Sequence, residues 1–319
     1  MNDYSIHKLR EEDFSLIIPL MLDCFGLDVD IDYFKWKFIE NPSGLVEGYY
    51  AKDSKGVVSA YYGVIPETFV INGERRIIYQ SCDTMTHSKH RRKGLFKKLA
   101  LECYKSLRNE NKLFVYGFGG GQSTPGFLKF GWDKIFKVKY YFYPKHFNLF
   151  SSLKNNSVYE ITDLKKIVHL TIKSNESIKV HSLKNYEIYK WRLSNPRHSY
   201  KTIAFQSKDG TYSGYITYYK EDNKIVIFDF FALDREANKN LFNYLKSSIK
   251  TGDKGVIAFC QENCLYSITL RKNSFITNPF KIGPLNEKIP FIFYAMYDEQ
   301  VILNDSKAWL INSFEHDAL

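Results

Sequence analysis

The chain contains a weak internal repeat, which limits its architecture more than any other feature. "YFKWKFIENP" at 33–42 resembles "IYKWRLSNP" at 188–196, and "GLFKKLALECYKSL" at 94–107 resembles "NLFNYLKSSI" at 240–249. Similarity at a nearly constant offset indicates two copies of one structural unit. We therefore predict two domains in tandem, residues 1–145 and 146–319, each long enough to bury its own core.

Signals for helices and strands follow a regular order in the first copy. Residues 10–26 and 31–42 have helical apolar spacing, and residues 46–65 predict two strands. Asn72-Gly73, between two β-rich runs, predicts a hairpin. An amphipathic helix from Gly94, a buried strand, a short helix and a last strand complete the unit. The predicted fold class is α/β (α+β): tandem units, each a mixed, mostly antiparallel sheet flanked by helices, the second degenerate.

The stretch "HSKHRRKGLFKKLA" at 87–100 lies between a predicted strand and that amphipathic helix. Free N–H groups at a helix N-terminus bind anions, and the helix dipole favours negative charge there. Gly94 would let the backbone approach a phosphate, and the basic run before it would supply charge. Basic side chains at a helix N-terminus are unfavourable to the helix dipole, so helix stability does not explain their presence here. The second copy has "REANKNLF" instead, so we expect phosphate binding in the first copy alone.

Charge and composition narrow the classes of function. The formal net charge of +10 favours anionic partners, but residues 87–98 are the one dense basic cluster, which argues against a nucleic-acid binder. No run of 18 apolar residues and no signal-peptide pattern occurs, which predicts a cytoplasmic protein without a membrane span. Five scattered cysteines indicate reduced thiols and no zinc site.

The motif and the element order resemble the GNAT family, the Gcn5-related N-acetyltransferases. The family signature is Arg or Gln, two residues, Gly, one residue, then Gly or Ala. This chain matches the signature at Arg91 and Gly94 but has Phe96 at the last position. "GFLKFGW" at 126–132 is similar to a later aromatic motif of the family. The resemblance covers residues 4–143 and, as a degenerate copy, the rest of the chain.

The resemblance implies acyl-coenzyme A as co-substrate and no metal. The pyrophosphate would bind residues 92–96, the pantetheine would follow the preceding strand, and a backbone N–H near Thr84 or Met85 would polarise the thioester carbonyl. Many family members protonate the leaving thiolate with a tyrosine, and Phe127 occupies that position here. The implied coenzyme A contacts are Thr84, Met85, Thr86, Arg91, Arg92, Lys93, Gly94, Leu95, Phe96, Gln122 and Phe127.

The reaction implied is direct attack of a primary amine on the thioester in a ternary complex. An ammonium group has no lone pair, so a base or a water chain must remove a proton first. Asp83, on the predicted strand, and His87, at its end, are the candidate catalytic bases. The alternatives are a structural carboxylate for Asp83 and a surface histidine for His87.

The second copy and the C-terminus resemble those of two-unit GNAT proteins of surface-polysaccharide biosynthesis. That resemblance implies a nucleotide-linked amino sugar as acceptor, bound with the help of the second unit. The suggested substrate contacts are Trp36, Tyr61, Glu315 and Asp317. Packing is the alternative for Trp36 and Tyr61, and a solvated acidic tail is the alternative for Glu315 and Asp317.

Other functions remain open at this stage. An aminoglycoside or peptide N-acetyltransferase is the alternative enzyme, and a non-catalytic GNAT-like binding module is the alternative outside enzymes. An acidic pocket would favour the polycationic aminoglycoside, whereas a basic pocket would favour a sugar nucleotide. The sequence does not indicate the acyl chain, the particular acceptor or the oligomeric state.

Overall fold

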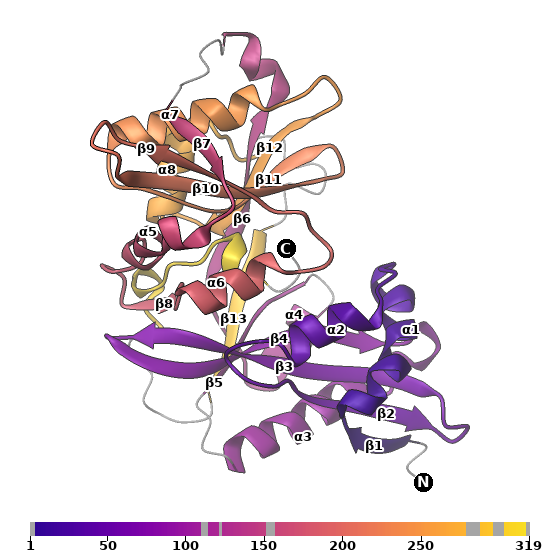
Figure 1. Cartoon of the computed structure of the whole chain (residues 1–319). Helices are drawn as coiled ribbons and strands as arrows, with labels where there is room; N and C mark the ends of the chain where they lie inside the picture. Colours follow the sequence, from indigo (N-terminus) through magenta and orange to yellow (C-terminus); the bar gives the residue numbers. More distant parts are fainter. Residues whose placement is uncertain are drawn as a thin grey trace.

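The computed structural model describes residues 4–109, 114–120, 123–150, 157–278, 288–295 and 303–316. The strands form one sheet in the order β1-β2-β3-β4-β5-β13-β6-β12-β11-β10-β9-β7, and β8 pairs with β3 outside this path. Figure 1 shows two halves, one above the other, with β6 and β13 running between them. The predicted α/β class, with a mixed sheet flanked by helices, is confirmed.

The first half follows the predicted order of elements, with one strand added at the beginning. The sequence did not predict this strand, β1, which has only five residues and pairs along one edge with β2. The elements are β1 (Tyr4–Lys8), α1 (Phe14–Phe25), α2 (Ile31–Phe38), β2 (Glu47–Asp53), β3 (Val58–Ile71), β4 (Glu74–Thr86), α3 (Leu95–Asn109), β5 (Phe114–Phe118), α4 (Thr124–Lys129) and β6 (Asp133–Pro144).

The second half repeats this order, apart from the short β8 inserted before its second helix. In both halves a parallel pair, β4 with β5 and β11 with β12, follows an antiparallel meander. The elements are β7 (Val158–Ile161), α5 (Val168–Lys173), β8 (Val180–Ser182), α6 (Tyr186–Leu193), β9 (Lys201–Gln206), β10 (Tyr212–Glu221), β11 (Lys224–Ala232), α7 (Arg235–Ser247), β12 (Gly255–Gln261), α8 (Leu265–Lys272) and β13 (Lys288–Ala295).

The hairpin between β3 and β4 is the one predicted from Asn72-Gly73. Ile71 pairs with Glu74, so the loop has two residues. Both loop residues have positive φ, 51° at Asn72 and 85° at Gly73. A two-residue hairpin loop of this kind needs left-handed backbone, which Asn and Gly adopt at low cost.

The two halves exchange their last strands. β6 of the first half pairs antiparallel with β12 of the second, from Gly255 opposite Pro144 to Gln261 opposite Val138. β13 of the second half pairs antiparallel with β5 of the first. The predicted division at 145/146 therefore falls directly after β6, while β13 completes the sheet of the half to which it does not belong in sequence.

The helices α2 and α6, which carry the clearest repeat in the sequence, meet between the halves. The indole Nε1 of Trp36 donates a hydrogen bond to the Trp191 carbonyl, and Nε1 of Trp191 donates to the Trp36 carbonyl, both at 2.8 Å. The two rings stack with centroids 5.4 Å apart. This reciprocal contact is the same from both sides and joins the two helices to each other.

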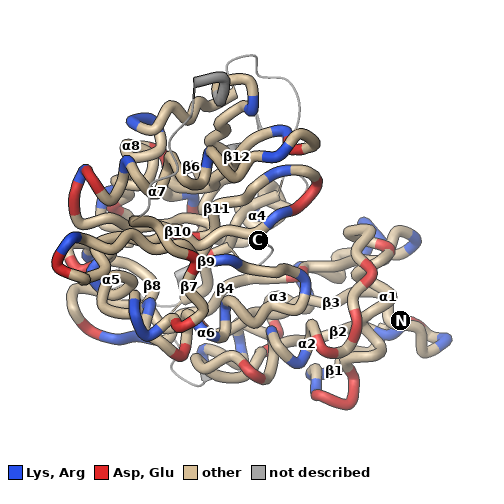
Figure 2. The backbone as a smooth tube through the Cα atoms, turned by 45° about the horizontal axis from the view of Figure 1, so that its top comes forward, with Lys and Arg blue, Asp and Glu red and all other residues tan. Residues whose placement is uncertain are grey.

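Charged residues are distributed over both halves. Figure 2 shows blue Lys and Arg segments and red Asp and Glu segments scattered over both halves, separated by longer stretches of other residues. In the part of the chain that the structure describes, no helix is both long enough and apolar enough to span a bilayer.

Candidate active site

The strands β4 and β5 separate after a short parallel contact. They pair only at Tyr79 with Val115 and at Gln80 with Tyr116, although β4 continues to Thr86. Just beyond this fork the pairing of β3 with β4 contains a bulge, since residues 83 and 84 both lie opposite one residue of β3. Asp83 has a φ of 47°, a left-handed backbone that Asp tolerates better than most residues. The bulge therefore lies in the part of β4 that follows its pairing with β5.

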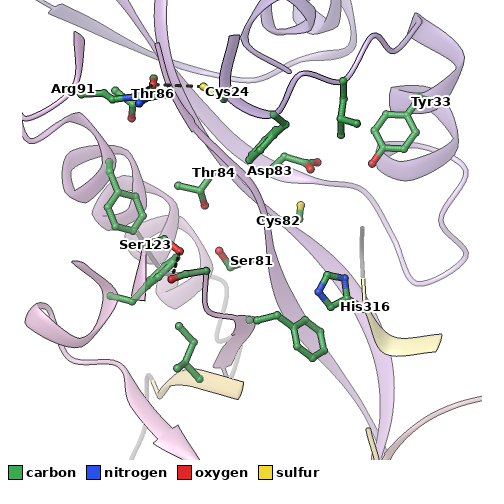
Figure 3. A pocket seen from close by; sticks show the side chains of 18 of the residues that line it. Cys24, Tyr33, Ser81, Cys82, Asp83, Thr84, Thr86, Arg91, Ser123 and His316 are labelled. Carbon is green, nitrogen blue, oxygen red and sulfur yellow. Dashed lines mark hydrogen bonds between the residues drawn. The ribbon is translucent and has the colours of Figure 1, made fainter. Parts of the chain in front are cut away.

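A cavity of about 610 Å³ lies in this gap. Figure 3 shows Ser81, Asp83 and Thr84 of β4, Ser123 before α4, and His316 of the C-terminal segment around one space. Both halves contribute, because Arg197 and His316 come from the second. The lining residues are Cys24, Phe25, Leu27, Tyr33, Ser81, Cys82, Asp83, Thr84, Thr86, Arg91, Phe96, Gly117, Phe118, Gly120, Ser123, Phe127, Arg197, Ile292 and His316.

A second cavity, of about 420 Å³, lies at the N-terminus of α3. It shares Thr86, Arg91 and Phe96 with the first cavity, so the two adjoin. Its described lining contains no carboxylate. The lining residues are Thr86, His90, Arg91, Arg92, Lys93, Gly94, Leu95, Phe96, Lys97, Gly126, Lys129 and Phe130. All five residues predicted to surround the pyrophosphate, Arg92 to Phe96, therefore line one hollow.

The backbone of this turn has the conformation that an anion site requires. Gly94 has a φ of 76° and Arg92 a φ of 65°. The first helical hydrogen bond joins the Lys98 N–H to the Gly94 carbonyl at 3.1 Å. The N–H groups of residues 95–97 precede that bond, so they have no partner within the helix, and these residues line the second cavity.

The equivalent turn in the second half is closed. Only Leu233 and Asp234 connect β11 to α7, compared with residues 87–94 between β4 and α3. The Asp234 carboxylate accepts a hydrogen bond from the Ala237 N–H at 2.8 Å. In the second half, a carboxylate therefore occupies the helix N-terminus that corresponds to the proposed phosphate position of the first half.

The departure from the family signature at Phe96 has a structural explanation. The Phe96 ring packs edge-on against Phe127, with centroids 4.8 Å apart. It also lies against Gly126 of α4, where an added Cβ would come within 3.0 Å of the ring. In the family signature the residue at position 96 is small. Here the small residue is Gly126 of α4, which leaves room for the Phe96 ring between α3 and α4.

Asp83 lines the main cavity, but its charge is already paired. Lys37 Nζ lies 2.7 Å from Asp83 Oδ2, and the two side chains are 1% and 8% exposed. Lys37 also donates to the Tyr33 hydroxyl at 3.3 Å. A carboxylate held this closely by a buried ammonium group is a poor proton acceptor, because protonation would remove the negative charge that compensates the buried cation.

His87 lies outside the described lining of both cavities. Its Nδ1 accepts a hydrogen bond from the Lys89 N–H at 3.2 Å, which caps the short turn Ser88–His90. Asp23 accepts hydrogen bonds from the N–H and hydroxyl of Ser88, and the first of these contributes most to lowering the pKa of Asp23. The structure therefore gives His87 a role in shaping the turn.

The remaining predicted coenzyme A contacts have different placements. Thr84 and Phe127 line the main cavity, and Phe127 brings no hydroxyl group to it. The Met85 side chain is buried in the core, so its possible ligand contact is through the backbone. Gln122 lies outside the described residues.

Of the four suggested substrate contacts, three are buried and one lies outside the described residues. Trp36 stacks on Trp191, and the fully buried Tyr61 fills the space left by Gly48 and Gly63. Neither lines the cavity, so the structure does not support a substrate contact for either side chain. Asp317 is the residue outside the described ranges.

Glu315 is buried in a charged cluster and also lies outside the cavity lining. Its Oε1 lies 3.8 Å from Lys184 Nζ, which forms a closer pair with Asp229 at 2.8 Å. Burial raises the pKa of the Glu315 carboxyl, although Lys184 opposes the shift. The expectation of a solvated acidic tail is wrong for Glu315, because its carboxylate accepts hydrogen bonds from Ser182 and Asn312.

Contacts at the fork place the residue after Glu315 in the cavity. The Glu315 carbonyl accepts hydrogen bonds from Gln80 Nε2 and, at 3.5 Å, from the Tyr116 hydroxyl, and these two residues form the last β4–β5 pair. The His316 ring stacks on Phe118 with centroids 4.3 Å apart. Arg192 holds the His316 carbonyl at 2.7 Å.

Sequence reasoning did not single out Cys24, Tyr33 or Arg197 as lining residues. It did point to the C-terminal ending that contains His316 as a segment near the acceptor, but it gave this histidine no role of its own. Cys24 is the one cysteine that is not buried, and its Sγ lies 3.5 Å from the Thr86 carbonyl; burial raises its pKa. No local motif marks these positions, except that Arg197 follows the repeated Asn-Pro pair. Within the described ranges, no group of three or more His, Cys, Asp or Glu side chains is arranged to hold a metal ion.

Comparison with known proteins finds a family match in the first half. Residues 5–135 match the family model described as an acetyltransferase (GNAT) domain, so the resemblance seen in the sequence is confirmed for this part of the chain. The chain matches none of the curated proteins by sequence.

Similar solved structures extend over both halves. A conserved protein of Enterococcus faecalis V583, described as a probable N-acyltransferase, is 13% identical with a TM-score of 0.68, covering 91% of this chain and 72% of that one. A GCN5-related N-acetyltransferase of Anabaena variabilis is 12% identical with a TM-score of 0.66 and the same two coverages. Saccharomyces cerevisiae N-myristoyltransferase with bound myristoyl-CoA is 10% identical with a TM-score of 0.65, covering 92% and 83%. At these identities the likeness establishes the fold.

Proposed function

We propose that this protein transfers an acyl group from acyl-coenzyme A to the amino group of a nucleotide-linked amino sugar. The observation that carries the acyltransferase part is the joining of two cavities, one at the open N-terminus of α3 and one in the fork between β4 and β5. A phosphate-binding turn leading into a polar gap between strands suits a long donor with a diphosphate at one end and a thioester at the other. The GNAT match of residues 5–135 supports this assignment.

The donor would bind through the turn and the end of β4. The free N–H groups of residues 95–97 and the basic side chains around them would hold the pyrophosphate. Thr84 and Thr86, on the cavity side of β4, would line the path of the pantetheine. The bulge at residues 83 and 84 would direct a backbone N–H to the thioester carbonyl oxygen, where negative charge develops during attack.

The chemical step would follow from an amine bound beside that thioester. The amine nitrogen attacks the carbonyl carbon, the carbon–sulfur bond breaks, and the coenzyme A thiolate leaves. The proton lost by the amine goes to His316, the one imidazole among the described lining residues. Asp83 would instead keep Lys37 neutralised beneath the bulge.

The charge of the cavity supports an anionic acceptor. The described lining contains two arginines, Arg91 and Arg197, and a single carboxylate, Asp83, whose charge Lys37 neutralises. A polycationic aminoglycoside would meet repulsion here, whereas a sugar nucleotide would bring a diphosphate. The yeast N-myristoyltransferase shares the two-unit fold, so a peptide amine is the competing acceptor to include in any test.

Binding of coenzyme A tests the donor assignment. Gly94→Glu would put a carboxylate at the phosphate turn, and we expect it to weaken acetyl-coenzyme A binding by at least about tenfold in calorimetry. Gly210→Glu is a matched control, because both glycines have positive φ and open space around the Cβ position. Failure of the native protein to bind coenzyme A would overturn the proposal.

Turnover with a panel of amines tests the acceptor. Release of the coenzyme A thiol would be followed with UDP-linked amino sugars, aminoglycosides and short peptides. We expect turnover with the sugar nucleotides. Turnover on peptides alone would remove the sugar assignment and leave the acyltransferase assignment intact.

A further inference from the structure

We propose that Arg197 binds an anionic group of the acceptor and so selects acceptors that carry a phosphate or a carboxylate near the amine. The inference rests on the proposed acyltransferase function and names the residue that would determine acceptor specificity. Arg197 belongs to the loop between α6 and β9 of the second half, yet its side chain lines the main cavity in the fork of the first half.

The turn that carries Arg197 occurs in both halves. Asn195 Oδ1 accepts a hydrogen bond from the Arg197 N–H at 3.0 Å, just as Asn41 Oδ1 accepts from the Ser43 N–H at 2.9 Å. Each turn has a proline between these two residues. The Asn-Pro pair therefore accounts for the turn, and the first half forms it with a serine where the second has arginine. The turn itself does not require the arginine.

The Arg197 guanidinium is available to a ligand. Among the described residues, none accepts a hydrogen bond from it or forms an ion pair with it. Its nearest aromatic support is Tyr33, whose ring centroid lies 5.8 Å from the guanidinium carbon. A cation–π contact of this kind supports a guanidinium without using its N–H donors. Five donors thus remain for a planar or tetrahedral anion.

The surroundings of Arg197 add positive rather than negative charge. Arg192 lies behind His316 and makes no ion pair with a described residue; its guanidinium donates to the His316 carbonyl. His198 stays neutral, because burial and the two nearby arginines lower its pKa to about 4. Tyr33 accepts a hydrogen bond from the buried Lys37. Arg197 and Arg192 would therefore both attract an anion bound here, and the one carboxylate of the described cavity lining, Asp83, is paired with Lys37.

The position of Arg197 assigns this charge to the acceptor. Arg91 is shared by the main cavity and the phosphate turn, so it belongs to the donor end. Arg197 lines the main cavity and is not among the described lining residues of the second cavity. It comes from the second half, in which Asp234 caps the turn that is equivalent to the phosphate turn. The second half thus contributes a charged contact where the first contributes the donor site.

Binding of matched sugars tests the proposal without requiring turnover. Glucose, glucose 1-phosphate and glucuronate share one ring and differ in charge, and all three lack the amine. Each would be titrated by calorimetry into the full-length protein saturated with coenzyme A. We expect glucose 1-phosphate or glucuronate to bind at least about tenfold more tightly than glucose, the effect of one charge-assisted contact.

Three variants assign that preference to Arg197. Arg197→Gln should remove the preference, Arg197→Lys should keep part of it, and Arg235→Gln, which removes an exposed arginine from the same half, should keep all of it. Tighter binding of glucose 1-phosphate would support a nucleotide-linked acceptor. Tighter binding of glucuronate would support the anion-binding role of Arg197, with an acceptor of a different class. Equal binding of the three sugars, or an unchanged preference in Arg197→Gln, would overturn the proposal.

Failure of the underlying function is separable from failure of this inference. Absence of coenzyme A binding would remove the acyltransferase assignment. The same titrations on the protein without coenzyme A would still compare Arg197→Gln with Arg235→Gln. If acceptors are identified, Arg197→Gln should raise KM for the anionic ones with little change in kcat, because the contact is made equally in the ground state and transition state.

Discussion

His316 shows how a single residue becomes functional only through the fold. It lies in the C-terminal segment, 193 residues after Ser123, which is the nearest in sequence of the described polar residues of the first half that line the cavity. Contacts of the preceding Glu315 carbonyl with Gln80 and Tyr116 bring it to the fork. The phosphate turn, in contrast, is contiguous from Arg91 to Phe96, so the sequence alone could indicate it.

Comparison of two histidine variants distinguishes the structural from the sequence-based choice of base. We predict that His316→Gln lowers kcat by about 100-fold, because general base catalysis contributes on this order. Loss of the titrating group should also change the pH profile of kcat. His87→Gln should act mainly on KM for acyl-coenzyme A, since His87 caps the turn before the phosphate site.

Steady-state kinetics over a range of pH values would make this comparison. A larger fall in kcat for His87→Gln than for His316→Gln would restore His87 as the base. Asp83→Asn is less informative, because it removes the negative charge that faces the buried Lys37 ammonium group, and we expect this to destabilise the fold.

At the scale of elements, a buried ionic cluster anchors the segment that carries His316. Lys184, between β8 and α6, pairs with Asp229 of β11 and approaches Glu315. Tyr215 and Asn312 also donate to Asp229, at 2.6 and 2.8 Å. The cluster joins the C-terminal segment to the second half, while Gln80 joins it to the first.

Removal of the cluster's cation should destabilise the fold strongly. We predict that Lys184→Met lowers the free energy of unfolding by about 3–5 kcal/mol, because it removes the cation that compensates two buried carboxylates. Lys190→Met is the matched control, since Lys190 is exposed on α6, and it should change stability little. Urea unfolding of both variants measures the difference, and equal stability of the two would contradict the role of the cluster.

The same variant should respond to pH. The pKa of Glu315 is raised above its unfolded value, so this group stabilises the folded state below its unfolded pKa, and that contribution is lost as the pH rises through its folded pKa. Without Lys184, the negative charge of ionised Glu315 is no longer balanced by the nearby ammonium group. The loss of stability in Lys184→Met should therefore be larger at pH 8 than at pH 5.

At the scale of the whole molecule, the exchange of β6 and β13 makes the halves interdependent. β5 has β13 as its neighbour on the side away from β4, and β6 lies between β13 and β12. Removal of the second half would expose the edge of β5 and both edges of β6. Such edges carry unpaired N–H and C=O groups and promote aggregation.

Expression of fragments tests this interdependence. We predict that residues 1–145, although they contain the whole GNAT match, do not fold into a monomer that binds coenzyme A. Co-expression with residues 146–319 should restore binding, because β13 then completes the first sheet. Gel filtration and calorimetry would show this, and a folded, coenzyme A-binding monomer of 1–145 would refute it.

The sequence by itself determined the features that depend on neighbouring residues. The Asn72-Gly73 hairpin, the beginning of α3 at the phosphate turn and the tandem order of elements all follow from local backbone preference and apolar periodicity. Tertiary structure alone decided which half each last strand completes, and which side chains meet in the fork. The pairing of Lys37 with Asp83 and the arrival of Arg197 and His316 join residues distant in sequence. Such contacts depend on packing between the halves, and no local pattern encodes them.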